Sequence, residues 1–137
     1  MDAGSEADGH YQNYAEYSKS LRSWLVAYGI GGPVLFLTNK DVYSKVAESA
    51  SSVAIVDLFL FGVGLQILLS VINKWAAYHM YRGAFAPAYT STMTYQIWSW
   101  INDRSWIDFL IDLVSIAVFV SATGLVLGIF MRASGAQ

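Results

Sequence analysis

The chain has 137 residues, of which 55% are hydrophobic and only 13% are charged, and its mean hydropathy is positive at +0.43. A soluble domain of this size needs more charge to cover its surface, so the composition favours a one-domain membrane protein in contact with a lipid bilayer. The net charge of −2, without a basic patch, argues against nucleic-acid binding. Cysteine is absent, which excludes disulfides, thiol catalysis and cysteine-ligated metals.

The beginning of the chain predicts a tail followed by an aromatic helix. Residues 1–10 are small and acidic, unlike the basic start of a signal peptide, so we expect a flexible tail that is not cleaved, with a single membrane domain over 11–137. Aromatic and apolar residues then recur at steps of three and four, at Tyr14, Tyr17, Leu21, Trp24 and Tyr28. We interpret this stripe as an interfacial anchor, with an aromatic ligand site as the alternative.

The first predicted span covers about residues 21–38, with Lys19 and Arg22 reaching outward to water. Its middle has the sequence GIGGPV, in which proline removes a backbone donor and disfavours helical geometry at the residue before it. We therefore expect a kinked or broken helix at Gly31, Gly32 and Pro33. The kink either serves helix packing, which we favour, or lines a cavity or gate.

The second span is predicted at about residues 52–73, within a longer helix. Thr38 and Asp41 have the spacing of a capping box, and no helix breaker follows, so the sequence predicts one helix from Asp41 to Arg82. One face of the span carries small and polar residues, at Gly62, Gln66, Ser70 and Asn73. A buried amide requires a partner, so we expect Gln66 to hydrogen-bond between helices, with a polar pore lining as the alternative.

Residues 83–91 are small and include Pro87, which predicts a loop, and Thr92 or Thr94 is expected to cap the third helix. Aromatic residues are concentrated on either side of this loop, at Trp75, Tyr78, Tyr81, Trp98, Trp100 and Trp106. We expect helices 2 and 3 to extend beyond the bilayer here, as an aromatic-rich helical hairpin over about residues 74–106.

The third span, at about residues 107–131, is long enough to cross a bilayer core of about 30 Å. Small residues share one of its faces, at Ala117, Ser121, Gly124 and Gly128. The last two have GxxxG spacing, which lets membrane helices approach closely, so we predict that this face mediates helix association.

The opposite face of the third span carries carboxylates. Arg104 and Asp108 are four residues apart, and we predict an ion pair between them on the helix surface. Asp112 lies deeper, and carboxylates inside a membrane are functional hypotheses by default. Together with the amide and hydroxyl groups of the second span, it defines a candidate polar path through Gln66, Ser70, Asn73 and Asp112.

The distribution of Lys and Arg favours three spans with the N-terminus inside, since five basic residues fall on the N-terminal side and three on the other. We expect an integral protein of a cytoplasmic membrane, such as a bacterial inner membrane.

No sequence motif supports catalysis. His10 and His79 are isolated, so we expect no metal site and no cofactor. Asp57 and Asp112 would enter the membrane from opposite sides, which argues against an aspartyl protease and for a protein that is not an enzyme.

Two non-enzymatic functions remain. The first is a small membrane protein that self-associates into a homo-oligomer, such as a pore, a channel or a membrane-perturbing effector. The second is an accessory or assembly subunit of a larger complex, in which the same faces pack against other membrane or soluble subunits.

Overall fold

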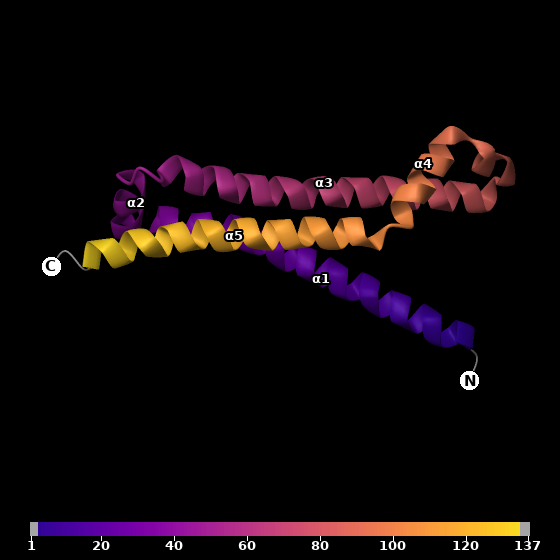
Figure 1. Cartoon of the computed structure of the whole chain (residues 1–137), viewed down its shortest axis with the longest axis horizontal. Helices are drawn as coiled ribbons and strands as arrows, with labels where there is room; N and C mark the ends of the chain where they lie inside the picture. The colour runs from indigo at the N-terminus through magenta and orange to yellow at the C-terminus, as the bar shows by residue number, and fades with distance from the viewer. Residues whose placement is uncertain (1–2, 135–137) are drawn as a thin grey trace.

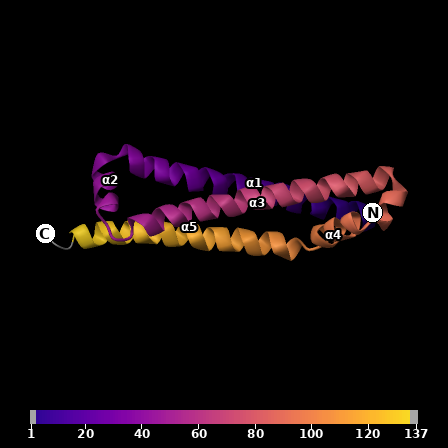
Figure 2. The same cartoon turned by 90° about the horizontal axis from the view of Figure 1, so that it is seen from above.

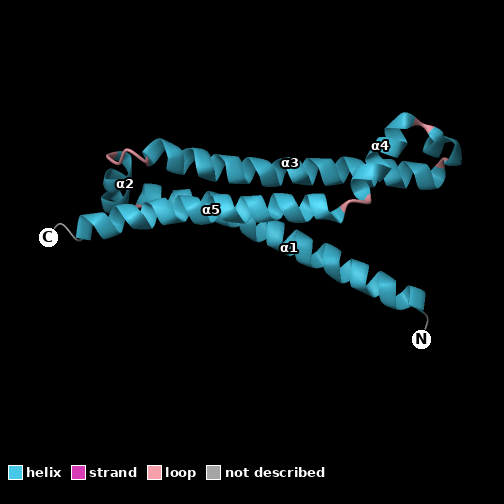
Figure 3. Cartoon of the chain, in the orientation of Figure 1, coloured by secondary structure: helices cyan, strands magenta, loops and turns pink. Residues whose placement is uncertain are grey.

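The computed structural model describes residues 3–134, and every secondary-structure element in this range is helical (Figure 3). In chain order the elements are α1 (Ala3–Thr38), α2 (Lys40–Ala47), α3 (Ser52–Phe85), the short 3₁₀ helix η1 (Pro87–Ser91), α4 (Met93–Asn102) and α5 (Ser105–Ser134). Three stretches are long and apolar enough to cross a membrane, at Gln12–Thr38, Ser52–Phe85 and Ser105–Arg132. The predicted all-α architecture with three membrane-length helices is therefore confirmed.

The helices α3 and α5 run antiparallel and side by side (Figure 1, Figure 2). Helix α1 crosses this pair and diverges from it toward its own beginning, where it includes most of the segment predicted as a tail (Figure 1). The short α2 joins α1 to α3 near the end of α5, and α4 packs against the far end of α3. Large apolar side chains such as Leu60, Leu68 and Leu113 are exposed on the outer faces, as in helices that contact lipid.

The interior of the bundle is a narrow seam between α3 and α5. Its residues are buried and recur at alternating steps of four and three. On α3 they are Ile55, Phe59, Gly62, Gln66 and Leu69, and on α5 they are Asp112, Ser115, Phe119, Ala122 and Val126. A period of 3.5 residues keeps one face of each helix turned toward the other, as in left-handed bundles of membrane helices.

Phe119 fills space that two glycines leave open. A Cβ added to Gly29 of α1 would lie 2.6 Å from the Phe119 Cζ, and one added to Gly62 of α3 would lie 2.5 Å from its Cε1. The rings of Tyr28 and Phe59 surround Phe119 with centroid distances of 5.8 and 6.0 Å. The absence of side chains at both glycines therefore lets all three long helices meet around one aromatic ring.

Helix α1 continues through Pro33 to Thr38, so it is not broken at Gly31, Gly32 and Pro33. Proline costs one backbone hydrogen bond, but in an apolar bundle the helix still satisfies the other backbone groups. Gly32 faces α3, where an added Cβ would come within 3.3 Å of Phe59. Gly32 thus contributes to the close packing of α1 on α3, whereas a Cβ added to Gly31 would meet nothing within 4 Å.

The prediction of one helix from Asp41 to Arg82 is wrong, because α2 ends at Ala47 and α3 begins at Ser52. Serine side chains in the intervening turn compete with helical hydrogen bonds, and the Ser51 N–H donates to the Ser49 Oγ at 3.1 Å. The second membrane-length helix is therefore separate from the short helix before it.

The helix caps are partly as predicted. Asn39, and not Thr38, caps α2, since its side chain accepts a hydrogen bond from the Asp41 N–H at 3.1 Å. Thr92 caps α4, as expected, and accepts a hydrogen bond from the Tyr95 N–H. Both residues satisfy backbone donors that a helix leaves free in its first turn.

The third predicted helix is divided in two. Helix α4 ends at Asn102 and α5 begins at Ser105, with a turn at Asp103 and Arg104 between them. Asn and Asp favour such turns because their side chains compete for backbone hydrogen bonds. Trp106 consequently belongs to the membrane-length α5 and not to α4.

We expect Gly62→Ala to lower the free energy of unfolding by about 1–3 kcal/mol, because its methyl group would overlap the Phe119 ring. Gly64→Ala is the matched control, since a Cβ added there on the same helix meets nothing within 4 Å. Denaturant unfolding in detergent micelles, followed by circular dichroism, measures the difference. Equal stability of the two variants would contradict the packing of Phe119 against Gly62.

Candidate functional site: a polar cluster between the long helices

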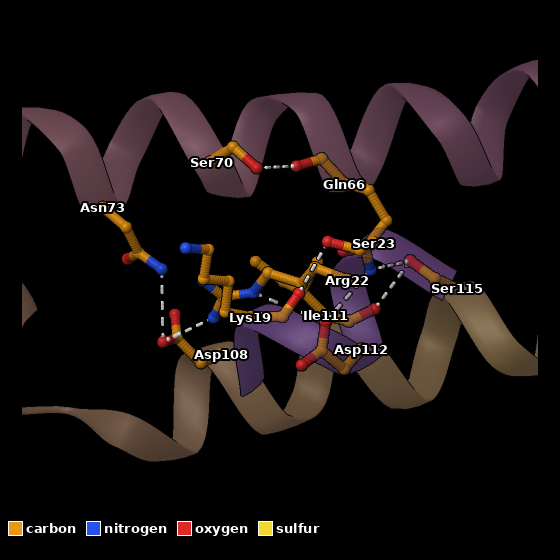
Figure 4. A network of polar contacts seen from close by, with 10 residues as sticks. All are labelled: Lys19, Arg22, Ser23, Gln66, Ser70, Asn73, Asp108, Ile111, Asp112 and Ser115. Carbon is orange, nitrogen blue, oxygen red and sulfur yellow. Dashed lines mark hydrogen bonds and ion pairs between the residues drawn. The ribbon is translucent and has the colours of Figure 1, made fainter. Parts of the chain in front are cut away.

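Six polar or charged side chains converge between the three long helices (Figure 4). We name this group the polar cluster, and it consists of Arg22 from α1, Gln66 and Asn73 from α3, and Asp108, Asp112 and Ser115 from α5. The α5 members continue the seam spacing at steps of four and three. Residues three and four apart lie on one face of a helix, so these side chains face the interior together with the apolar residues further along α5.

The outer layer of the polar cluster is an ion pair between α1 and α5. The Arg22 guanidinium donates to the Asp108 Oδ2 at 2.8 Å, and the side chains are 17% and 23% exposed. The Asn73 amide donates to the same oxygen at 3.3 Å. Asp108 therefore joins all three long helices through one carboxylate.

The inner layer is centred on the side-chain amide of Gln66, which is fully buried. Its Nε2 donates to the Asp112 Oδ1 at 3.0 Å and to the Ser115 Oγ at 2.9 Å. The Ser115 hydroxyl in turn donates to the Ile111 carbonyl at 2.9 Å. The hydrogen bond expected between helices at Gln66 is thus present, and it brings Gln66 and Asp112 together.

Two buried atoms of the polar cluster have no hydrogen-bond partner, the Arg22 Nε and the Gln66 Oε1. The Arg22 Nε lies 4.0 Å from the Asp112 Oδ1, too far for a hydrogen bond but close enough for electrostatic attraction. An unsatisfied buried polar atom costs about 1–3 kcal/mol. The polar cluster therefore contains an unpaired donor, the Arg22 Nε, and an unpaired acceptor, the Gln66 Oε1. Both belong to side chains that lie beside the Asp112 carboxylate.

Asp108 pairs with Arg22, so the predicted ion pair with Arg104 is not formed. Arg104 precedes the first residue of α5. Arg104 and Asp108 are four residues apart in the chain but therefore do not lie on the same face of one helix. Its guanidinium instead stacks over the Trp100 ring, 3.9 Å from the centroid. Arg22, which we expected to reach outward, points into the bundle.

The four residues of the predicted polar path do not form a continuous line. Gln66 and Asp112 are bonded to each other, and Asn73 bonds Asp108 one layer further out. Ser70 is exposed and donates to the Gln66 backbone carbonyl at 2.8 Å, within its own helix. Beyond Ser115 the seam continues with Phe119, which packs against Gly29 and Gly62.

The predicted association face lies on the side of α5 that the chain leaves uncovered. Ala117, Ser121 and Gly124 are exposed and Gly128 is half-buried. A Cβ added to Gly124 or Gly128 would meet nothing within 4 Å. This face is therefore available to another helix.

His79 is buried in an aromatic cluster between α3, η1 and α4. It stacks on Trp98 and Tyr89 at centroid distances of 5.5 and 6.0 Å, and its Nδ1 forms a 2.7 Å hydrogen bond with the Tyr89 hydroxyl. Over residues 3–134 no group of three histidine or acidic side chains could hold a metal ion. His79 thus stabilises the packing of α4 on α3.

A largely apolar groove of about 700 Å³ lies between α1, α2 and α3. Pro33, Val46, Ile55 and Phe59 are among its lining residues, and Asp57 is the one charged group that lines it. None of its lining residues belongs to the polar cluster. Neither its position nor its shape follows from the pattern of the sequence, because α2 was expected to continue into α3.

Arg22 is the member of the polar cluster that sequence reasoning does not find. Its signal is the spacing of Arg22, Leu25 and Gly29, which repeats the steps of three and four on the buried side of α1.

Comparison with known proteins gives no matching family model, no matching curated protein and no matching solved structure. The polar cluster must therefore be interpreted from its own chemistry.

We expect Arg22→Gln to lower the free energy of unfolding by about 3 kcal/mol, because it leaves the Asp108 carboxylate without its cation inside the bundle. Arg104→Gln, which removes a stacking contact of the half-buried Arg104 on the exposed Trp100, should change it by less than about 1 kcal/mol. Unfolding in detergent micelles compares the two. A double-mutant cycle with Asp108→Asn must show coupling for Arg22 and none for Arg104, or the assignment of the ion pair fails.

Proposed function

We propose that the protein is an integral membrane protein that self-associates into a homo-oligomer through the outer face of α5. The observation that carries this proposal is the uncovered row of small residues Ala117, Ser121, Gly124 and Gly128. Small residues at this spacing let helix backbones approach closely, which is the main source of association between membrane helices. The polar cluster lies on the opposite side of α5, so it leaves this face free.

The dimensions of the long helices support a placement across a bilayer. From Ser52 to Asn73, α3 is about 32 Å long, close to the roughly 30 Å of a bilayer core. The end of α3 and all of α4 then lie outside the core as a helical hairpin. The exposed rings of Trp75, Tyr78 and Tyr81 fall at the boundary, where aromatic residues are enriched.

The narrower proposal is that the oligomer acts as a pore, a channel or a membrane-perturbing effector. Its support is that three membrane-length helices make up most of the described residues. Gln66 is fully buried, and Phe119 fills the seam beyond it, so a path within one protomer is closed in this conformation. A conducting path therefore lies between protomers or requires the α3–α5 seam to open.

Native mass spectrometry of the purified protein in detergent tests self-association. We expect a defined homo-oligomer that dissociates when Gly124→Leu and Gly128→Leu are combined, because the larger side chains prevent close approach. Gly64→Leu, at an exposed glycine of α3 whose added Cβ also meets nothing within 4 Å, is the matched control. An oligomer that survives the double substitution would show that this α5 face contacts lipid and would overturn the proposal.

Release of a dye trapped in lipid vesicles tests the pore. We expect the wild-type protein to release the dye and the Gly124→Leu, Gly128→Leu double variant to release none, because its protomers do not assemble. Gln66→Leu separates the two possible paths, since it reduces release only if the α3–α5 seam opens to line the path. Intact vesicles at protein concentrations that give the oligomer would contradict the pore.

A second candidate function, an accessory subunit of a larger membrane complex, is favoured by the apolar groove between α1, α2 and α3. A groove of about 700 Å³ can accept a helix of another subunit, and Asp57 could pair with a basic residue on that helix. In that case the protein alone would be a monomer in the same mass spectrometry experiment. It would become stable only together with its partner.

A further inference from the structure

The polar cluster has one more negative than positive charge. Asp108 and Asp112 from α5 face a single cation, Arg22 from α1, and α3 contributes only the neutral side chains of Gln66 and Asn73. The nearby cations Lys19 and Lys74 are exposed and have no ion pair with either carboxylate. An uncompensated charge between apolar helices is unfavourable, and a single proton would neutralise it.

The contacts distinguish the two carboxylates. Asp108 accepts one charge-assisted hydrogen bond from Arg22 and a further bond from Asn73, and its side chain is 23% exposed. The Asp112 side chain is 9% exposed, its one hydrogen bond comes from a neutral amide, and the Arg22 Nε is 4.0 Å away. Asp108 is therefore the better stabilised anion, and Asp112 is the carboxylate that binds the proton.

Gln66 provides a partner for Asp112 in both protonation states. Its Nε2 donates to the Asp112 carboxylate, while its Oε1 is a buried acceptor without a partner. Rotation of the amide exchanges these two atoms, which are nearly indistinguishable in shape. After rotation the Oε1 can accept the hydrogen of a protonated Asp112, so the direction of this hydrogen bond reverses with the proton. The Ser115 hydroxyl, which accepts from Nε2 and donates to the Ile111 carbonyl, then turns to donate to the Oε1.

We infer that Asp112 is a reversible proton-binding site inside the bundle, with Gln66 as its partner in both states. The proton comes from water at the end of the bundle where Arg22 and Asp108 remain partly exposed, and it forms an O–H bond on Asp112. Ser115 and Phe119 close the seam on the other side, so exchange is confined to one end. This inference does not depend on association through the opposite face of α5.

Infrared spectroscopy of the protein in dodecyl maltoside micelles, whose detergent has no carbonyl group, tests the inference. A protonated carboxyl group has a carbonyl stretching band that a carboxylate lacks, and exposed Asp and Glu side chains are ionised at neutral pH. We expect this band in the wild-type protein at neutral pH and its loss in alkaline buffer. It should be completely absent from Asp112→Asn, which keeps the shape of the side chain and an oxygen that can accept from Gln66.

Two variants serve as controls. Asp57→Asn removes the exposed carboxylate of the groove and should keep the band, whereas Gln66→Leu should shift it to higher frequency because the acid loses its hydrogen-bond acceptor. Circular dichroism verifies that each variant remains helical. A wild-type spectrum without the band at neutral pH, or a band that persists in Asp112→Asn, would overturn the inference. Loss of the band on adding sodium chloride at constant pH, but not choline chloride, would assign the site to a metal cation instead.

Discussion

The ion pair between Arg22 and Asp108 is the constraint on which the bundle depends. Both groups sit on the buried faces of otherwise apolar helices, where each charge alone would be strongly unfavourable. Joined at 2.8 Å and completed by the Asn73 amide, they fix the rotation of α1, α3 and α5 about their axes. The apolar contacts further along the seam, which have little directional preference, then follow from this orientation.

Polar and apolar interactions occupy different halves of the bundle. From Asp108 to Ser115 the contacts of α5 are hydrogen bonds and ion pairs. From Phe119 to Val126 they are mainly packing contacts of rings and aliphatic side chains, with one hydrogen bond between the Thr123 and Tyr28 hydroxyls. Side-chain exposure falls from Asp108 through Asp112 to Ser115, which is fully buried. The half that contains charges is therefore accessible from one end of the molecule, and the other half is mainly apolar.

The sequence predicts the long helices well because their apolar length is a property of each segment alone. It also predicts that Gln66 bonds between helices, since a buried amide has few other options. It does not predict the partner of Asp108, because local spacing favours Arg104 while the actual cation is distant in the chain. Only the relative rotation of α1 and α5 decides between these two arginines, and that rotation depends on contacts among all three helices.

The sequence does not predict the helix boundaries at these turns, for a different reason. The turns at Ser49 and at Asp103 contain no proline or glycine, and their side chains differ little from those of helix interiors. Serine and aspartate favour a turn only modestly, so tertiary packing determines whether the chain reverses there. The same dependence on packing applies to Gly29 and Gly62, whose role becomes visible only once Phe119 lies between them.

The unequal lengths of the apolar segments have a consequence for the surrounding lipid. In α1 the apolar stretch from Trp24 to Leu37 is about 20 Å long, whereas in α5 the stretch from Leu113 to Met131 is about 28 Å long. In the proposed placement across a membrane, the bilayer would therefore be thinner beside α1 than beside α5. Hydrophobic mismatch of this kind favours thin membranes and the lateral clustering of molecules along their short side.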